Sequence, residues 1–195
     1  MDWSILFAGP VGAGKTQAIR SASDVEVVGT EAAATDDTAR IKANTTVAMD
    51  MGVMRLDDTD RIRLLGAPGQ DRFDFMWDIL VQQARGVVIL VDHSRFQALD
   101  DLRFYAEQMR QRAGTRFLPW VVGVTHVDQA PSADLSAYRA LLEAFRTPGS
   151  RGPVPVMRVD AREKRDVRAA LIALAAMLEV TSRFGLRAPE SAAAR

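Results

Sequence analysis

Short apolar segments alternate along the chain with longer segments in which apolar residues recur at helical spacing. Residues 3–8, 87–92, 120–125 and 154–159 are mostly apolar and rich in β-branched or aromatic side chains, which is typical of strands buried on both faces of a parallel sheet. The helical spacing predicts helices over residues 15–23, 74–83, 99–112, 134–145 and 164–178. Strands alternating with helices indicate a parallel sheet joined by crossover helices.

Two further strands are expected to differ from these four. Residues 46–56 and 61–66 are separated by a short polar connector with three aspartates, which predicts an antiparallel hairpin at the sheet edge. Within the first strand Val47, Met49, Met51 and Val53 alternate, and we interpret this stripe as core packing. Residues 31–45 and 147–153 have the composition of loops.

A glycine-rich motif joins the first predicted strand to the first predicted helix. Residues 9–16 read Gly-Pro-Val-Gly-Ala-Gly-Lys-Thr and match G-x-x-x-x-G-K-[ST] in full. Backbone amides of such a loop surround a phosphate, and the helix directs its positive end at the same anion. Lysine then reaches the β- and γ-phosphates, and the threonine hydroxyl ligates Mg²⁺. The expected nucleotide contacts are Gly9, Gly12, Ala13, Gly14, Lys15, Thr16 and the adjacent Gln17.

Composition narrows the cellular setting. The 195 residues contain 48% apolar residues, 25 basic and 25 acidic residues, and no cysteine. A neutral chain lacks the net positive charge expected of a general nucleic-acid binder, and the absence of cysteine excludes cysteine-ligated zinc and thiol catalysis. Asp2 excludes N-myristoylation, and the last residues carry no prenylation cysteine. We expect a cytoplasmic protein that has no direct membrane anchor and does not bind nucleic acid.

The order of elements from Gly9 to about Val180 resembles a Ras-superfamily small GTPase, most closely the bacterial branch with MglA-type and conservon-type GTPases. Residues 45–50 (Thr-Thr-Val-Ala-Met-Asp) and 66–73 (Gly-Ala-Pro-Gly-Gln-Asp-Arg-Phe) carry this likeness. The resemblance implies an α/β fold: a three-layer P-loop NTPase with a mostly parallel six-stranded sheet, one antiparallel edge hairpin and helices on both faces. It places one GTPase domain over residues 1–180 and a tail, a candidate flexible end, over residues 181–195. The implied ligands are GTP or GDP with Mg²⁺.

The resemblance also assigns the two switch segments. Thr46 corresponds to the threonine that ligates Mg²⁺ and senses the γ-phosphate, with Thr45 as an adjacent rival. The amide of Gly69 would meet the γ-phosphate, and Gln70 would orient the attacking water, which makes Gln70 and Lys15 the expected catalytic residues. The family's usual magnesium-site aspartate is replaced by Gly66.

Two other carboxylates, Asp50 and Asp92, are open as replacements for that aspartate. The sequence does not choose between them.

Residues Thr125-His126-Val127-Asp128 stand where related GTPases carry Asn-Lys-x-Asp. The carboxylate of Asp128 would accept hydrogen bonds from N1 and N2 of guanine. Thr125 lacks the amide that braces the phosphate loop in relatives, and the flat ring of His126 would stack on the base. Residues Asp160-Ala161-Arg162, which follow the last predicted strand, resemble the family's Ser-Ala-Lys element, whose alanine amide contacts guanine O6.

Val11 replaces a glycine found in many small GTPases and should crowd Gln70, so we expect slow hydrolysis. Arg40 and Lys42 precede Thr46, and either could stabilise the charge that develops on the γ-phosphate during hydrolysis. The simpler interpretation is that both are solvated charges of a loop. Residues 71–77 either form a partner-binding patch or pack their helix onto the sheet.

Three functions therefore stay open. The leading one is a GTPase switch read by a protein regulator or effector, by resemblance of the roadblock or longin type, in bacterial polarity, motility or signalling. The second is a GTP-binding scaffold with negligible hydrolysis. The third is an ATP-dependent small-molecule kinase, although no arginine-rich lid segment is evident.

Overall fold

The computed structural model describes residues 2–29, 50–56, 60–68, 74–129, 134–145 and 152–184. A seven-stranded sheet runs in the order β2-β3-β4-β1-β5-β6-β7. Strands β4, β1, β5, β6 and β7 are parallel, whereas β3 is antiparallel to both β2 and β4. The strands are β1 (Asp2–Ala8), β2 (Val28–Gly29), β3 (Asp50–Arg55), β4 (Arg61–Gly66), β5 (Gly86–Asp92), β6 (Trp120–Thr125) and β7 (Val156–Arg158).

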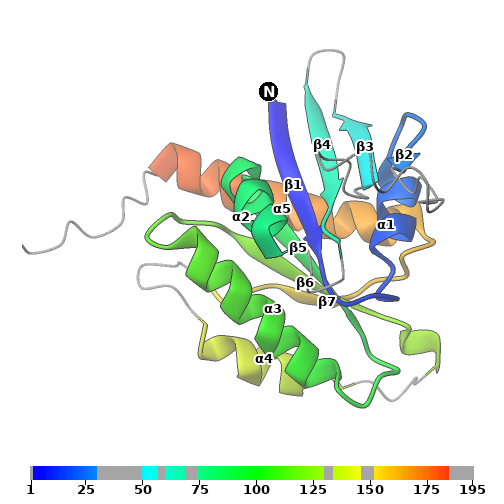
Figure 1. Cartoon of the computed structure of the whole chain (residues 1–195), viewed down its shortest axis with the longest axis vertical. Coiled ribbons are helices and arrows are strands. Elements are labelled where there is room, and N and C mark those ends of the chain that lie inside the picture. The colour runs from blue at the N-terminus through cyan, green and yellow to red at the C-terminus, as the bar shows by residue number, and fades with distance from the viewer. Residues whose placement is uncertain are drawn as a thin grey trace, which may run out of the picture.

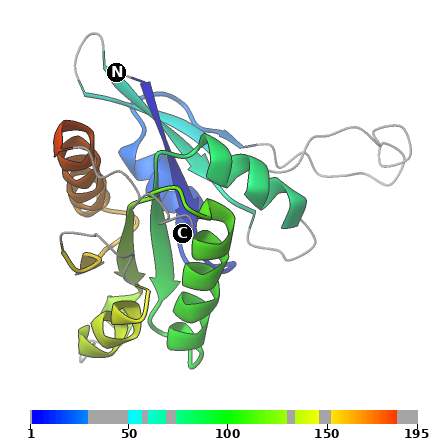
Figure 2. The same cartoon turned by 90° about the vertical axis from the view of Figure 1, so that its left-hand side faces the viewer.

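Helices cover both faces of this sheet, which gives three layers (Figures 1 and 2). Two of them, α1 (Lys15–Ala22) and α5 (Lys164–Phe184), pack together on one face. On the other face lie α2 (Asp74–Gln83) and α3 (Ala98–Ala113), with α4 (Ser136–Glu143) packed against α3. A short 3-10 helix, η2, covers Val127–Gln129. The α/β three-layer fold with an antiparallel hairpin is confirmed, and the two-residue β2 adds a seventh strand beside β3.

The core consists of two apolar layers, one under each pair of helices. Strand β5 contributes to both layers: Val88 and Leu90 lie under α1 and α5, while Val87, Ile89 and Val91 lie under α2 and α3. All five side chains are fully buried. A strand buried on both faces needs a continuous apolar sequence, which is the reason these segments were identifiable from composition.

Several boundaries differ from the sequence expectation. Helix α4 covers Ser136–Glu143 rather than residues 134–145. It begins two residues later than expected because the Asp134 carboxylate accepts hydrogen bonds from the amide and hydroxyl of Ser136, at 2.8 and 2.5 Å, and so stays outside the helix. Strand β7 is limited to Val156–Arg158, following Pro155, which has no amide to donate. Helix α5 continues to Phe184, so the tail expected from residue 181 is helical for its first four residues.

The interpretation of the methionine stripe as core is wrong for Met51. Its side chain is 42% exposed, while its neighbours Gly52 and Met54 are buried. A Cβ atom on Gly52 would lie 2.9 Å from Ile19 Cγ2 of α1. The strand does alternate, but Gly52 and Met54 face the helix and Met51 does not. Helix α1 lies so close to β3 at position 52 that a side chain there would have to displace Ile19. Val47 and Met49 lie outside the described residues.

Candidate functional site

The glycine-rich loop follows β1 and ends where α1 begins, as its sequence predicts (Figure 1). Gly9 has a φ of 139°, and a Cβ atom there would lie 2.2 Å from the carbonyl oxygen of Leu90 in β5. No other residue fits this position without moving the backbone. The close packing of β1 against β5 therefore fixes where the loop starts. Gly14, with a φ of 92°, precedes the first helical residue, Lys15.

The ammonium group of Lys15 crosses this loop and donates hydrogen bonds to the carbonyl oxygens of Gly9 and Pro10, at 2.7 and 2.8 Å. Burial lowers the pKa of Lys15 to about 8, and the nearby carboxylate of Asp50 partly opposes that shift. A desolvated cation held at the mouth of a helix-opening loop is well placed to be stabilised by an anion. The expected phosphate site thus has its cation in position.

The next residue, Thr16, points to the first residue of β3. Its hydroxyl donates a 2.5 Å hydrogen bond to Oδ2 of Asp50. A hydroxyl and a carboxylate are hard oxygen donors of the kind that Mg²⁺ accepts, usually with phosphate oxygens and water completing its shell. Within the described ranges, no three His, Cys, Asp or Glu side chains gather as a metal site. The pair of oxygens therefore fits a magnesium ion that a bound phosphate also ligates.

Thr125, at the end of β6, braces the loop through its hydroxyl. This group lies 3.1 Å from the carbonyl oxygens of both Ala13 in the loop and Val91 in β5, and the residue is 1% exposed. Its one proton serves one acceptor at a time. Thr125 has no side-chain amide, as noted from the sequence, but its hydroxyl reaches the loop at the carbonyl oxygen of Ala13.

His126 begins the loop after β6 with a left-handed backbone. Its φ is 55°, the only positive value at a non-glycine residue in the part of the chain that the structure describes. Its Nδ1 lies 3.1 Å from Thr125 Oγ1 and 3.3 Å from Oδ1 of Asp92. Such backbone strain is characteristic of sites where the surroundings dictate side-chain position. The contact with Asp92, the last residue of β5, orients the imidazole ring. Stacking of this ring on a base stays a prediction.

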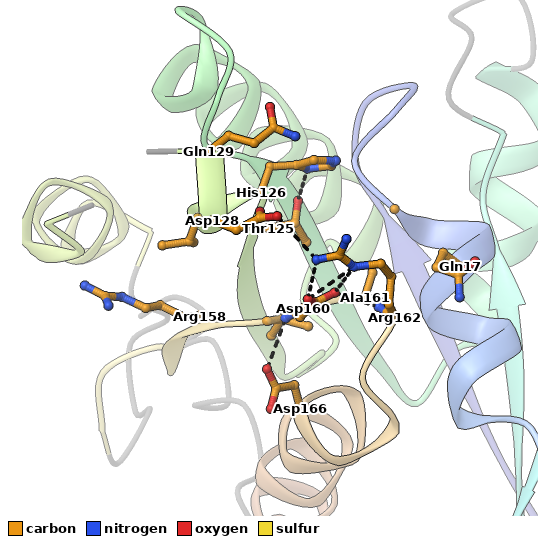
Figure 3. A pocket seen from close by; sticks show the side chains of 13 residues that line it. Gln17, Thr125, His126, Asp128, Gln129, Arg158, Asp160, Ala161, Arg162 and Asp166 are labelled. Atoms are coloured by element: carbon orange, nitrogen blue, oxygen red, sulfur yellow. Dashed lines mark hydrogen bonds and ion pairs between the residues drawn. The ribbon is translucent and has the colours of Figure 1, made fainter. Parts of the chain in front are cut away.

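A cavity of about 490 Å³ opens beside the loop, between η2 and the turn after β7. Its wall includes Gly14 and Gln17 at the phosphate end, and Thr125 and His126 at the end of β6 (Figure 3). The remaining lining residues are Val127, Asp128, Gln129, Arg158, Val159, Asp160, Ala161, Arg162 and Asp166. Six expected base or loop contacts from three sequence segments (Gly14, Gln17, Thr125, His126, Ala161 and Arg162) therefore share one cavity with the carboxylate of Asp128. Ser21 of α1 donates a 2.6 Å hydrogen bond to the carbonyl oxygen of Ala161, which ties the turn after β7 to α1.

Asp160 and Arg162 form a network at the edge of this cavity (Figure 3). The guanidinium of Arg162 donates to Asp160 through Nε and Nη2, at 2.9 and 2.7 Å, and its Nη2 also lies 3.3 Å from Oδ2 of Asp128. The Arg162 hydrogen bonds lower the pKa of Asp160 to about 2, and the same hydrogen bonds raise the pKa of Arg162. The sequence placed Asp160 in the element with Ala161 and Arg162, but it did not predict that the Asp160 carboxylate would hold Arg162 beside Asp128.

Some expected residues lie outside the described part of the chain. These are the switch residues Thr46, Gly69 and Gln70, together with Thr45, Arg40, Lys42 and residues 71–73. Of the patch that follows, Trp77 is 6% exposed and its ring centroid lies 5.5 Å from that of Tyr105. Trp77 thus packs α2 against α3 in the core, which agrees with the second interpretation for this one residue; the side chains of residues 71–76 lie outside the described part of the chain.

Comparison with protein families gives one finding that bears on this site. The model of a family described as a conserved hypothetical ATP binding protein matches residues 22–181. The match begins at the end of α1 and so excludes the glycine-rich loop, which makes the loop an independent indication of nucleotide binding. A comparison with curated proteins finds no match. No helix in the described part of the chain is long and apolar enough to cross a membrane.

Proposed function

We propose that this chain, which belongs to the family of conserved hypothetical ATP-binding proteins and so to the nucleotide-binding P-loop proteins, binds GTP with Mg²⁺ and hydrolyses it slowly. The protein acts as a nucleotide-dependent switch. In the GTP state the γ-phosphate orders the two switch segments, and hydrolysis to GDP releases them. A protein regulator or effector reads the difference.

One observation supports this proposal most: Asp128, the expected base reader, shares a cavity with the end of the phosphate loop. Its side chain is 59% exposed and so accessible to a ligand. Guanine presents two adjacent donors, N1–H and N2–H, which match the two oxygens of a carboxylate. Adenine has an acceptor at N1, which a carboxylate repels. The chemistry of Asp128 therefore favours guanine.

The phosphate end has the groups that a triphosphate needs. Lys15 would exchange its carbonyl partners for phosphate oxygens, and Thr16 with Asp50 would hold Mg²⁺, which neutralises charge on the β- and γ-phosphates. Hydrolysis is assigned to Gln70, which orients water, with Thr46 and Gly69 sensing the γ-phosphate. Val11 at the loop tip is 64% exposed, where it would crowd an incoming glutamine.

The family description names ATP, whereas Asp128 favours GTP, so nucleotide choice is the first test. Titration of the purified protein with GTP, GDP and ATP, each with Mg²⁺ and with EDTA, should give tight guanine binding and weak adenine binding. Asp128→Ala, which removes the two acceptors, should reduce GTP affinity and leave the weak ATP affinity unchanged. Equal or tighter ATP binding would reject the guanine assignment and favour an ATPase or a small-molecule kinase.

A GTP-binding scaffold is the second candidate, because Val11 and Gly66 each depart from the pattern of an efficient GTPase. Single-turnover hydrolysis of bound GTP separates the two functions. A measurable rate that Gln70→Ala abolishes supports the switch. A rate indistinguishable from free GTP, both alone and with a roadblock- or longin-type candidate regulator, supports the scaffold.

A further inference from the structure

Gly66 ends β4, where the sequence resemblance leads one to expect a magnesium-site carboxylate, yet it has no side chain. The space beside it is filled from the neighbouring strand. A Cβ atom added to Gly66 would lie 3.2 Å from Cβ of Asp50 and 3.4 Å from its Oδ2. The antiparallel register, in which Met51 pairs with Leu65, brings the first residue of β3 next to the last residue of β4. Asp50 therefore stands where a carboxylate at position 66 would project.

The carboxylate of Asp50 is also directed at the phosphate loop. Its Oδ2 accepts the 2.5 Å hydrogen bond from Thr16 Oγ1, and its charge acts on the Lys15 ammonium. Asp50 is half-buried, so solvent screens these interactions less than it would on the surface. An aspartate four positions after Thr46 thus reaches the hydroxyl expected to bind Mg²⁺.

The other candidate carboxylate, Asp92, makes its contacts away from Thr16. Its Oδ1 accepts hydrogen bonds from the amide and hydroxyl of Ser94, at 3.0 and 2.6 Å, and faces Nδ1 of His126 at 3.3 Å. These contacts tie Asp92 to the loop after β5 and to the base end of the site. No hydrogen bond or ion pair found among the described residues links it to Thr16.

We propose that Asp50 supplies the carboxylate of the Mg²⁺ site, so that the acidic group has moved from the end of β4 to the start of the antiparallel strand β3. This inference rests on the proposed nucleotide-binding function. When bound, Mg²⁺ would neutralise phosphate charge, while Asp50 and Thr16 hold it against the loop.

The test compares nucleotide affinity with Mg²⁺ and with EDTA in the full chain, using fluorescent GDP, or ADP if the wild type prefers adenine. Asp50→Asn should reduce the Mg²⁺-dependent gain in affinity by about 10- to 100-fold. Its affinity in EDTA should stay equal or increase, because a negative charge near the phosphates is gone. The matched control, Asp92→Asn, should keep the wild-type ratio of the two affinities. Mn²⁺ binding to the nucleotide complex, followed by electron paramagnetic resonance, should weaken only in Asp50→Asn.

The outcomes separate the two proposals. A wild type that binds no nucleotide refutes the function and this inference with it. A wild type with a strong Mg²⁺ effect that Asp50→Asn retains overturns the inference and leaves the function intact. An effect lost in Asp92→Asn instead assigns the role to Asp92.

A swapped protein, Asp50→Gly with Gly66→Asp, guards against misfolding of the single variant. Removing the Asp50 side chain frees the space for one at position 66, leaving Ile19 Cδ1 at 3.0 Å, the movable end of a side chain, as the close neighbour. Restored Mg²⁺ dependence supports the exchange of positions. A folded swapped protein without that dependence counts against it.

Discussion

Replacing Thr125 with valine tests whether its hydroxyl holds the phosphate loop. Valine has nearly the same shape but no donor, so the carbonyl oxygens of Ala13 and Val91 both lose the group that lies 3.1 Å from them. The hydroxyl has one proton and donates to one carbonyl at a time, and its oxygen also lies 3.1 Å from Nδ1 of His126. Valine removes the buried donor and the contact with His126. We therefore expect a loss of about 1–3 kcal/mol in the free energy of unfolding, measured by urea denaturation.

The same substitution should weaken nucleotide binding. If most of that loss is local to the loop, part of the binding free energy of the phosphates is used to order Ala13 and its neighbours. Each 1.4 kcal/mol used in this way lowers the nucleotide affinity by about tenfold. Thr125→Ser keeps the hydroxyl and is the matched control, with near wild-type affinity. A valine variant as stable as wild type, with unchanged nucleotide affinity, would refute the brace. A serine variant weaker than the valine variant would show that methyl packing matters and the hydroxyl does not.

Three other predictions follow from single residues. Val11→Gly should increase the single-turnover rate of GTP hydrolysis, because space opens for Gln70, and an unchanged rate would remove Val11 as the cause of slow hydrolysis. Hydrogen bonds from the Lys164 side chain and the Arg55 amide hold the pKa of Asp24 below its ordinary value of 3.8. The stabilisation by the Asp24 carboxylate is therefore present above pH 3.8 and is lost as the pH falls through the lower folded pKa. The difference in stability between wild type and Asp24→Asn should be seen at about pH 7 and should narrow as the pH falls below 3.8. Arg116→Met should reduce the free energy of unfolding by about 1–3 kcal/mol, because Arg116 donates to the carbonyls of Val81 and Ala84 at the end of α2; a variant that melts like wild type would show that water replaces those bonds.

The sequence determined the fold class and the position of the phosphate loop. Strands β5 and β6 are buried on both faces and so consist of nearly uninterrupted apolar residues. The sequence therefore predicts both strands without knowledge of the neighbouring strands they pair with. The loop motif is local, because its glycines and Lys15 act through one strand–turn–helix unit. The segment Thr125–Asp128 was recognisable for the same reason, since it follows a buried strand directly.

Tertiary structure decided what depends on contacts between distant segments. Whether Met51 or Met54 faces the core depends on the side of β3 that α1 approaches, and alternation is equally consistent with either. Likewise, the sequence left Asp50 and Asp92 equal as magnesium-site carboxylates. The pairing of β3 with β4 brings Asp50 beside Gly66 and Thr16, 34 positions away in the chain, and no local pattern contains that information.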